Sequence, residues 1–287
     1  MSDLWGLLLD IVHLAGRTAD RVVDGLGMDG GNLDGFVGWL AGDADWLVAG
    51  TMAAILVALW AMLMSGLVSW MDRRVRARVE GRLGPRYRGW GGILQGLADW
   101  VKLMLCGRMG MPSAAAAALS GALALGALAL LPLCVWVRLV DPGWGVMVAA
   151  GLCALSPLPL AAVAPAGGRH AEAAEAAGTG VVLMLAVAAP TLIAGDGSAA
   201  GLVAAQSDWG WGIVLAPLGF LLFLLVMYWE AGRLERTRGT STPPEGWPGP
   251  HRAIARFAVA TRYYTLGVLG AIVFLGGWSG PVQDGFQ

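Results

Sequence analysis

Charged residues are scarce in this sequence. Only 14% of its 287 residues are Asp, Glu, Lys or Arg, while 57% are hydrophobic. Soluble domains carry about 25% charged residues, so this composition indicates an integral membrane protein. The formal net charge is −1, which excludes a protein that attracts nucleic acid through a bulk positive charge.

Cysteine and histidine are also sparse, and their positions argue against a metal centre. Cys106, Cys134 and Cys153 form no C-x-x-C pair, so neither an iron–sulfur cluster nor a zinc site is expected. We interpret all three as small hydrophobic residues. His13 and His251 are far apart in the sequence, and it contains no P-loop or G-x-G-x-x-G motif. We therefore expect no bound metal or nucleotide in this chain.

Long apolar segments are abundant. A helix of about twenty apolar residues crosses a bilayer core, and six segments have about this length, which predicts an all-α polytopic membrane protein. The third segment, residues 144–165, contains Pro157, Pro159 and Pro165, which predict a kink or break in the helix. The fourth, residues 178–195, contains Pro190, so the pattern does not define where this helix begins and ends. The six segments are residues 46–70, 114–137, 144–165, 178–195, 210–229 and 257–278.

The N-terminal region differs in composition from the rest. Apolar residues at helical spacing over 4–24 predict an interfacial amphipathic helix, with a seventh span as the alternative. Residues 27–45 are rich in Gly and Asp and are expected to form a loop. Asp10 interrupts the first apolar run, so no cleavable signal peptide is expected. The predicted organisation is an extracytoplasmic or interfacial segment 1–45, a single membrane domain 46–280 and a tail 281–287.

Basic residues predict the orientation in the membrane. Segments 71–113, 166–177 and 230–256 are basic, whereas the segments between them and the N-terminal 45 residues are poor in Lys and Arg. Because cytoplasmic loops carry the Lys/Arg excess, we expect these three loops in the cytoplasm. Both termini are then expected on the outer side of the cell inner (plasma) membrane.

The most basic stretch is residues 72–108, which holds nine of the nineteen Lys and Arg residues. On a helix Arg74, Arg78 and Arg82 lie on one stripe, and Gly84-Pro85 ends that helix. Taken alone, such a cluster is typical of an anchor that contacts lipid phosphates.

An amphipathic helix is predicted after the Gly-rich bend of this stretch. Apolar residues recur at helical spacing from Ile93 to Met104, while Gln95, Asp99 and Lys102 fall together on the other face. One interpretation is a passive helix at the membrane interface. The other is that the amide, the acid and the amine line a pocket for a polar headgroup.

Three motifs in this order resemble the family of membrane-arm subunit 1 of respiratory complex I. The first comprises Asp72-Arg73-Arg74, Arg82-x-Gly84-Pro85 and the ILQGLADWVKL helix at Ile93–Leu103, and it is similar to the first cytoplasmic loop of that family. The second is Pro217-Leu218-Gly219-Phe220 followed by Glu230-x-x-Arg233. The third is Tyr263-Tyr264 followed by Phe274-Leu275-Gly276-Gly277-Trp278. Together they cover roughly residues 50–280.

The resemblance implies a membrane-arm subunit of a complex I-like NADH:quinone oxidoreductase. Such a subunit anchors the peripheral redox arm, contributes to the chamber for the quinone substrate and is coupled to proton translocation. The iron–sulfur clusters and flavin would belong to partner subunits, so the isolated chain is not expected to be active. Its expected partners are soluble iron–sulfur subunits, antiporter-like membrane subunits and membrane lipid.

The resemblance also implies which residues act. Glu230, Glu172 and Glu175 are the candidates for the proton path, with Arg233 one turn from Glu230 to stabilise its charge. For Glu172 and Glu175 a solvated helix start, where acids favour the helix dipole, is an equal alternative. The candidates for the quinone chamber and the arm interface are Asp72, Arg73, Arg76, Arg82, Gln95, Asp99, Lys102 and Arg233.

Departures from the family pattern leave two further functions open. The loop after Arg233 retains only Glu235 and Glu245 of an acid-rich stretch, and Arg262 stands where the family has an acid. The family pattern also implies two helices after Trp278, where this sequence has nine more residues. One alternative is the membrane anchor of an energy-converting nickel–iron hydrogenase or formate hydrogenlyase-type complex. The other is a non-redox membrane scaffold or transporter that uses the same fold.

Overall fold

The computed structural model describes residues 44–81, 84, 90–105, 111–132, 142–163, 169–238 and 249–278, and within these ranges the regular structure is entirely helical. The helices are α3 (Ala44–Val79), a short 3-10 helix (Trp90–Gly92), α4 (Gln95–Leu105), α5 (Met111–Ala129), α6 (Gly145–Leu155), α7 (Leu158–Ala162), α8 (Arg169–Ala194), α9 (Ala199–Trp209), α10 (Gly212–Leu215), α11 (Pro217–Arg238) and α12 (Gly249–Phe274).

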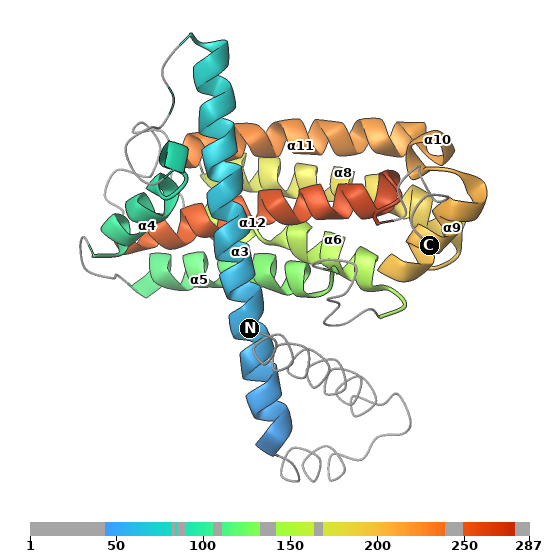
Figure 1. The fold of residues 1–287 in the computed structure, drawn as a ribbon, viewed down its shortest axis with the longest axis horizontal. Coiled ribbons are helices and arrows are strands. Elements are labelled where there is room, and N and C mark those ends of the chain that lie inside the picture. The colour runs from blue at the N-terminus through green and yellow to red at the C-terminus, as the bar shows by residue number, and fades with distance from the viewer. Residues whose placement is uncertain are drawn as a thin grey trace.

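A bundle of helices surrounds α12 (Figure 1). Helices α5, α6, α8 and α11 run along α12, whereas α3 crosses them steeply. The short α4 lies at one end of the bundle, against α3 and α12, and α9 and α10 lie at the other end. The span of α12 is 67% buried and that of α3 only 17%, so α12 is the central element and α3 is peripheral.

The expected fold class, an all-α polytopic membrane protein, is confirmed. Among the residues that the structure describes, five helical segments are long and apolar enough to cross a membrane, one of them formed by α6 and α7 together, and Ala114–Ala129 is a shorter apolar helix. Each of the six predicted segments overlaps one of these helices, although α5 ends at Ala129 where the second segment was predicted to reach residue 137. The predicted break at Pro157 separates α6 from α7, whereas Pro190 stays inside α8.

Some helices extend beyond the predicted segments. Most of the stretch between the fourth and fifth predicted spans, residues 196–209, forms helix α9. The Ser198 hydroxyl accepts a hydrogen bond from the Gly201 amide at 3.0 Å and caps this helix. Helix α8 already begins at Arg169 and α11 continues to Arg238, so parts of two predicted loops are helical. The predicted N-terminal helix 4–24 lies outside the described residues, as do Cys106 and Cys134.

The end of α12 explains the Gly-Gly pair of the third motif. Gly276 and Gly277 have φ angles of 78° and 55°, a region that favours glycine. The buried Gln206 side chain of α9 accepts hydrogen bonds from the amides of Gly276 at 2.9 Å and Gly212 at 3.0 Å, and it donates to the Ile272 carbonyl at 2.7 Å. One amide side chain therefore ties α9, α10 and the end of α12 together.

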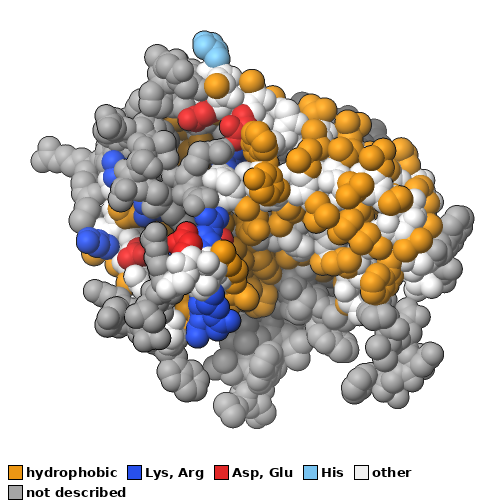
Figure 2. Space-filling model, turned by 90° about the horizontal axis from the view of Figure 1, so that it is seen from above, with side chains coloured by type: hydrophobic (Ala, Val, Ile, Leu, Met, Phe, Trp, Pro, Cys, Tyr) orange, Lys and Arg blue, Asp and Glu red, His pale blue; other side chains and the backbone are white. Residues whose placement is uncertain are grey.

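Charge and hydrophobicity are segregated on the surface. Figure 2 shows hydrophobic side chains gathered over one broad part of the molecule and charged side chains gathered toward the opposite end. Large apolar side chains such as Leu59, Leu185 and Leu221 are more than half exposed. An exposed apolar surface of this extent suits contact with lipid rather than water, in agreement with a multi-pass membrane protein.

Candidate functional site

A cavity of about 420 Å³ lies between α3, α4 and α12, with Leu234 of α11 also on its wall. The polar part of its lining comes from Ser65, Ser69, Asp72, Arg73 and Arg76 of α3, Asp99 of α4 and Arg256 of α12. The apolar part includes Met62, Leu97, Trp100, Leu103 and Phe257. An apolar pocket with a few convergent polar groups is the usual form of a small-molecule site.

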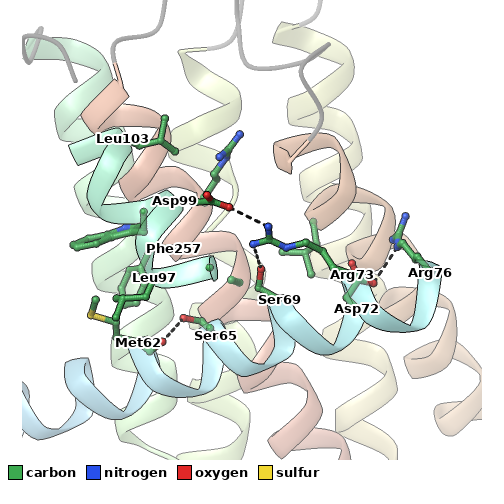
Figure 3. A pocket seen from close by; sticks show the side chains of 16 residues that line it. Met62, Ser65, Ser69, Asp72, Arg73, Arg76, Leu97, Asp99, Leu103 and Phe257 are labelled. Atoms are coloured by element: carbon green, nitrogen blue, oxygen red, sulfur yellow. Dashed lines mark hydrogen bonds and ion pairs between the residues drawn. The ribbon is translucent and has the colours of Figure 1, made fainter. Parts of the chain in front are cut away.

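An ion pair joins two walls of this cavity. Arg73 of α3 donates to the Asp99 carboxylate of α4 at 3.0 Å and to the Ser69 hydroxyl, one turn earlier, at 3.3 Å (Figure 3). The side chains of Arg73 and Asp99 are 31% and 47% exposed, so solvent screens the pair. A second ion pair, Arg76–Asp72 at 3.1 Å, follows along α3.

Helix α4 contributes Leu97, Asp99, Trp100 and Leu103 to the cavity wall. The Trp100 indole donates to the Ala253 carbonyl of α12 at 3.1 Å and fixes the helix in place. None of the eleven residues of α4 is buried, and its apolar side chains Val101 and Leu105 are exposed, as is Leu94 just before it. The predicted amphipathic helix is therefore present, with its apolar side available to the membrane interface.

The bend before α4 is held by α3. The Trp70 indole donates to the Gly91 carbonyl at 2.8 Å, and Gly91 has a φ of 64°, which favours glycine. The Arg74 guanidinium lies 5.0 Å from the centre of the Trp70 ring, within cation–π distance. These contacts set the position of α4, and thereby of Asp99, relative to Arg73.

A cluster of four charged residues lies deeper, where α8, α11 and α12 meet. Glu230 of α11 is completely buried, and its Oε1 lies 2.8 Å from Arg262 Nη1 and 3.1 Å from Arg233 Nη1. Arg233 also reaches Glu175 of α8 at 3.4 Å. The Glu175 carboxylate accepts a further hydrogen bond from the Trp229 indole at 2.7 Å.

The structure brings together some of the predicted site residues and separates others. Asp72, Arg73, Arg76 and Asp99 line the cavity, whereas Gln95 and Lys102 do not, and Lys102 is exposed. Glu230, Arg233 and Glu175 meet in the four-residue charge cluster. Glu172 is exposed on the surface of α8, and Arg82 lies outside the described residues.

Sequence reasoning did not assign a role to Arg262 or Arg256. Arg262 stood out only as a departure from a family pattern, yet it makes the shortest ion pair with Glu230. A charged residue within a long apolar segment is itself a signal, because charge inside a membrane span usually has a partner or a function. That signal would have identified Arg262 without identifying its partner.

The chain was compared with known protein families. The family model described as NADH dehydrogenase matches residues 51–235, which is more than half of the 287-residue chain. The matched range includes most of α3, all of α4 and the Glu230–Arg233 pair, and it ends before α12.

Proposed function

Because the chain belongs to the NADH dehydrogenase family of complex I membrane subunits, we propose that it is the membrane-arm subunit of a complex I-like NADH:quinone oxidoreductase. In this role it anchors the peripheral redox arm and forms part of the quinone chamber. The observation that carries the proposal is the cavity between α3, α4 and α12, within and beside the matched range.

The cavity suits a quinone headgroup in size and in chemistry. A volume of about 420 Å³ is within the range of small-molecule sites. Met62, Leu97 and Phe257 offer apolar contact to a ring and the start of its tail. The Arg73 guanidinium is a donor for a quinone carbonyl oxygen, and Asp99 keeps it oriented.

In the proposed reaction this chain binds and orients the quinone. The electrons come from an iron–sulfur cluster of a soluble partner. Reduction adds negative charge to the quinone, which the guanidinium groups of Arg73 and Arg256 stabilise before protons arrive. The same basic end of α3, with Arg76, faces the redox arm in the cytoplasm.

Coupling to proton translocation is the finer part of the proposal and involves the four-residue charge cluster. Glu175 is the member best placed to exchange a proton, because its side chain is 23% exposed while that of Glu230 is fully buried. Glu172, three residues earlier on α8, is exposed on the surface of the helix. We therefore place the exchanging group at Glu175.

The test of the assembly is purification of the tagged full chain from native membranes in mild detergent, followed by mass spectrometry. Recovery of iron–sulfur, flavin and antiporter-like subunits is the expected result. A nickel-binding large subunit among the partners would replace the proposal with the hydrogenase-type anchor. Recovery of the chain without redox subunits, while control complexes remain intact, would replace it with a scaffold or transporter.

A further inference from the structure

The feature that the proposed function leaves unexplained is Arg262. It lies in the middle of α12, the central helix, and its side chain is 2% exposed. Burying a guanidinium is costly unless a carboxylate and hydrogen bonds compensate for it. The carboxylate that compensates for Arg262 is that of Glu230, whose Oε1 lies 2.8 Å away.

The geometry around Glu230 disfavours a protonated carboxyl group. Oε1 accepts a hydrogen bond from Arg233 Nη1 at 3.1 Å and lies 2.8 Å from Arg262 Nη1 in an ion pair, although the Arg262 nitrogens make no hydrogen bond among the described residues. Guanidinium groups have no acceptor, so a proton on Oε1 would face only N–H groups. Oε2 is buried and has no hydrogen-bond partner among the described residues. A proton on Oε2 would therefore be a buried donor without an acceptor, which costs free energy.

The charges of the cluster also disfavour protonation of Glu230. Two carboxylates, Glu175 and Glu230, face two guanidinium groups, Arg233 and Arg262, so the cluster is neutral when both acids are ionised. From α6, the thiol of Cys153 is near enough to interact electrostatically with Arg262 and Glu230, and it adds no charge as a thiol. Protonation of Glu230 would leave an excess positive charge in the interior.

We propose that Arg262 is a positioning residue that holds Glu230 as a permanent carboxylate. Glu230 then connects α11 to α12, through Arg262, and to α8, through Arg233 and Glu175, without exchanging a proton. Proton exchange within the cluster is left to Glu175. This inference rests on the proposed function only for proton exchange at Glu175. The ionised state of Glu230 can be measured on this chain alone.

The first test is a double-mutant cycle on unfolding of the full chain in mild detergent. Glu230→Gln leaves the buried Arg262 without its carboxylate, and Arg262→Gln leaves the buried Glu230 with Arg233 alone, so each is expected to lower the folding equilibrium constant roughly hundredfold or more. The double variant Glu230→Gln/Arg262→Gln removes both charges and is expected to recover at least about tenfold of that loss.

The control is the same cycle on Asp72 and Arg76, an ion pair that is 26% and 34% exposed. Asp72→Asn and Arg76→Gln are expected to change the folding equilibrium constant by less than about fivefold each. Additive effects of the Glu230 and Arg262 substitutions would overturn the proposal.

The second test does not require a single variant to fold. Infrared difference spectra of the wild-type complex, recorded over the pH range in which it stays assembled, report the carbonyl band of any protonated carboxyl group. We expect no such band from Glu230, and thus the same bands in the double variant. A band that is present in wild type and lost in the double variant would overturn the proposal. The double-mutant cycle needs no partner subunit. If the chain were purified without redox partners, the proposed function would be refuted, and the inference about Arg262 and Glu230 would still be tested by the cycle.

Discussion

Two ion pairs of this protein have the same chemistry and opposite surroundings. The Arg73–Asp99 pair at the cavity measures 3.0 Å, and its side chains are 31% and 47% exposed. The Arg262–Glu230 pair inside the bundle measures 2.8 Å, and its side chains are 2% and 0% exposed. The distances differ little, so burial decides what each pair contributes.

An exposed pair contributes little to folding because water and salt screen it, and its groups remain free to bind other partners. A buried pair contributes little net stability when formed, yet it is very costly to break, because the remaining charge cannot reach water. The cavity pair is therefore suited to binding a ligand. The interior pair is suited to fixing the relative positions of helices.

The largest expected effect is that of Arg262→Met. Methionine fills similar space without charge and leaves Glu230 with Arg233 alone, so we expect the free energy of unfolding to fall by about 3–5 kcal/mol. Denaturant unfolding of the full chain in mild detergent measures it. Arg262→Lys, which retains the charge, is the matched control and should lose less. Equal losses in both variants would mean that shape rather than charge matters here.

A smaller effect is expected for Glu175→Gln, at the partly exposed edge of the cluster. The variant loses a charged contact with Arg233 but keeps an acceptor for the Trp229 indole, so we expect a stability loss of about 1 kcal/mol. In the proposed function it also lowers quinone-coupled proton translocation by roughly tenfold or more, since an exchanging acid is removed.

Glu172→Gln on the same helix is the comparison that decides between the two acids. We expect it to retain more coupled translocation than Glu175→Gln in the same membrane vesicles. The reverse order would place the exchanging acid at Glu172, on the exposed surface of α8.

Several features of the fold could be predicted from the sequence. The spans were predictable because apolar length is a local property, and the break at Pro157 because proline removes a backbone donor. Helix α9 was not expected, although Ser198 before an Ala-rich run is a capping signal. The scarcity of basic residues in that segment indicates its side of the membrane, but it does not distinguish a loop from a helix.

The candidate site was less predictable than the fold because its contacts join distant segments. Arg73 and Asp99 were both candidates, but their pairing depends on how α4 docks on α12. Lys102 shares the predicted polar face with Asp99, yet helical rotation leaves it exposed. The partner of Glu230 lies 32 residues later on α12, beyond the reach of helical periodicity.

A still smaller effect on stability is expected for Asp99→Asn at the cavity. The exposed ion pair is worth about 0–1 kcal/mol, so unfolding should change little. Labelling by a photoreactive quinone should fall by roughly tenfold, because Arg73 loses the carboxylate that orients it. Lys102→Gln on the same helix is the control, since Lys102 lies outside the cavity lining. Equal labelling in both variants would remove the Arg73–Asp99 pair from the proposed quinone site.

The smallest effect is expected for Asp72→Asn. Asp72 and Arg76 are one turn apart on α3, 3.1 Å from atom to atom, and neither is buried. Exposed pairs at this spacing contribute about 0.3–0.5 kcal/mol, and the contribution should shrink further in high salt because the Debye length falls to about 3 Å at 1 M. Salt should leave the effect of Arg262→Met unchanged, since that pair is shielded from ions. If salt changed the effect of both substitutions on the free energy of unfolding equally, burial would not explain the difference between the Asp72–Arg76 and Arg262–Glu230 pairs.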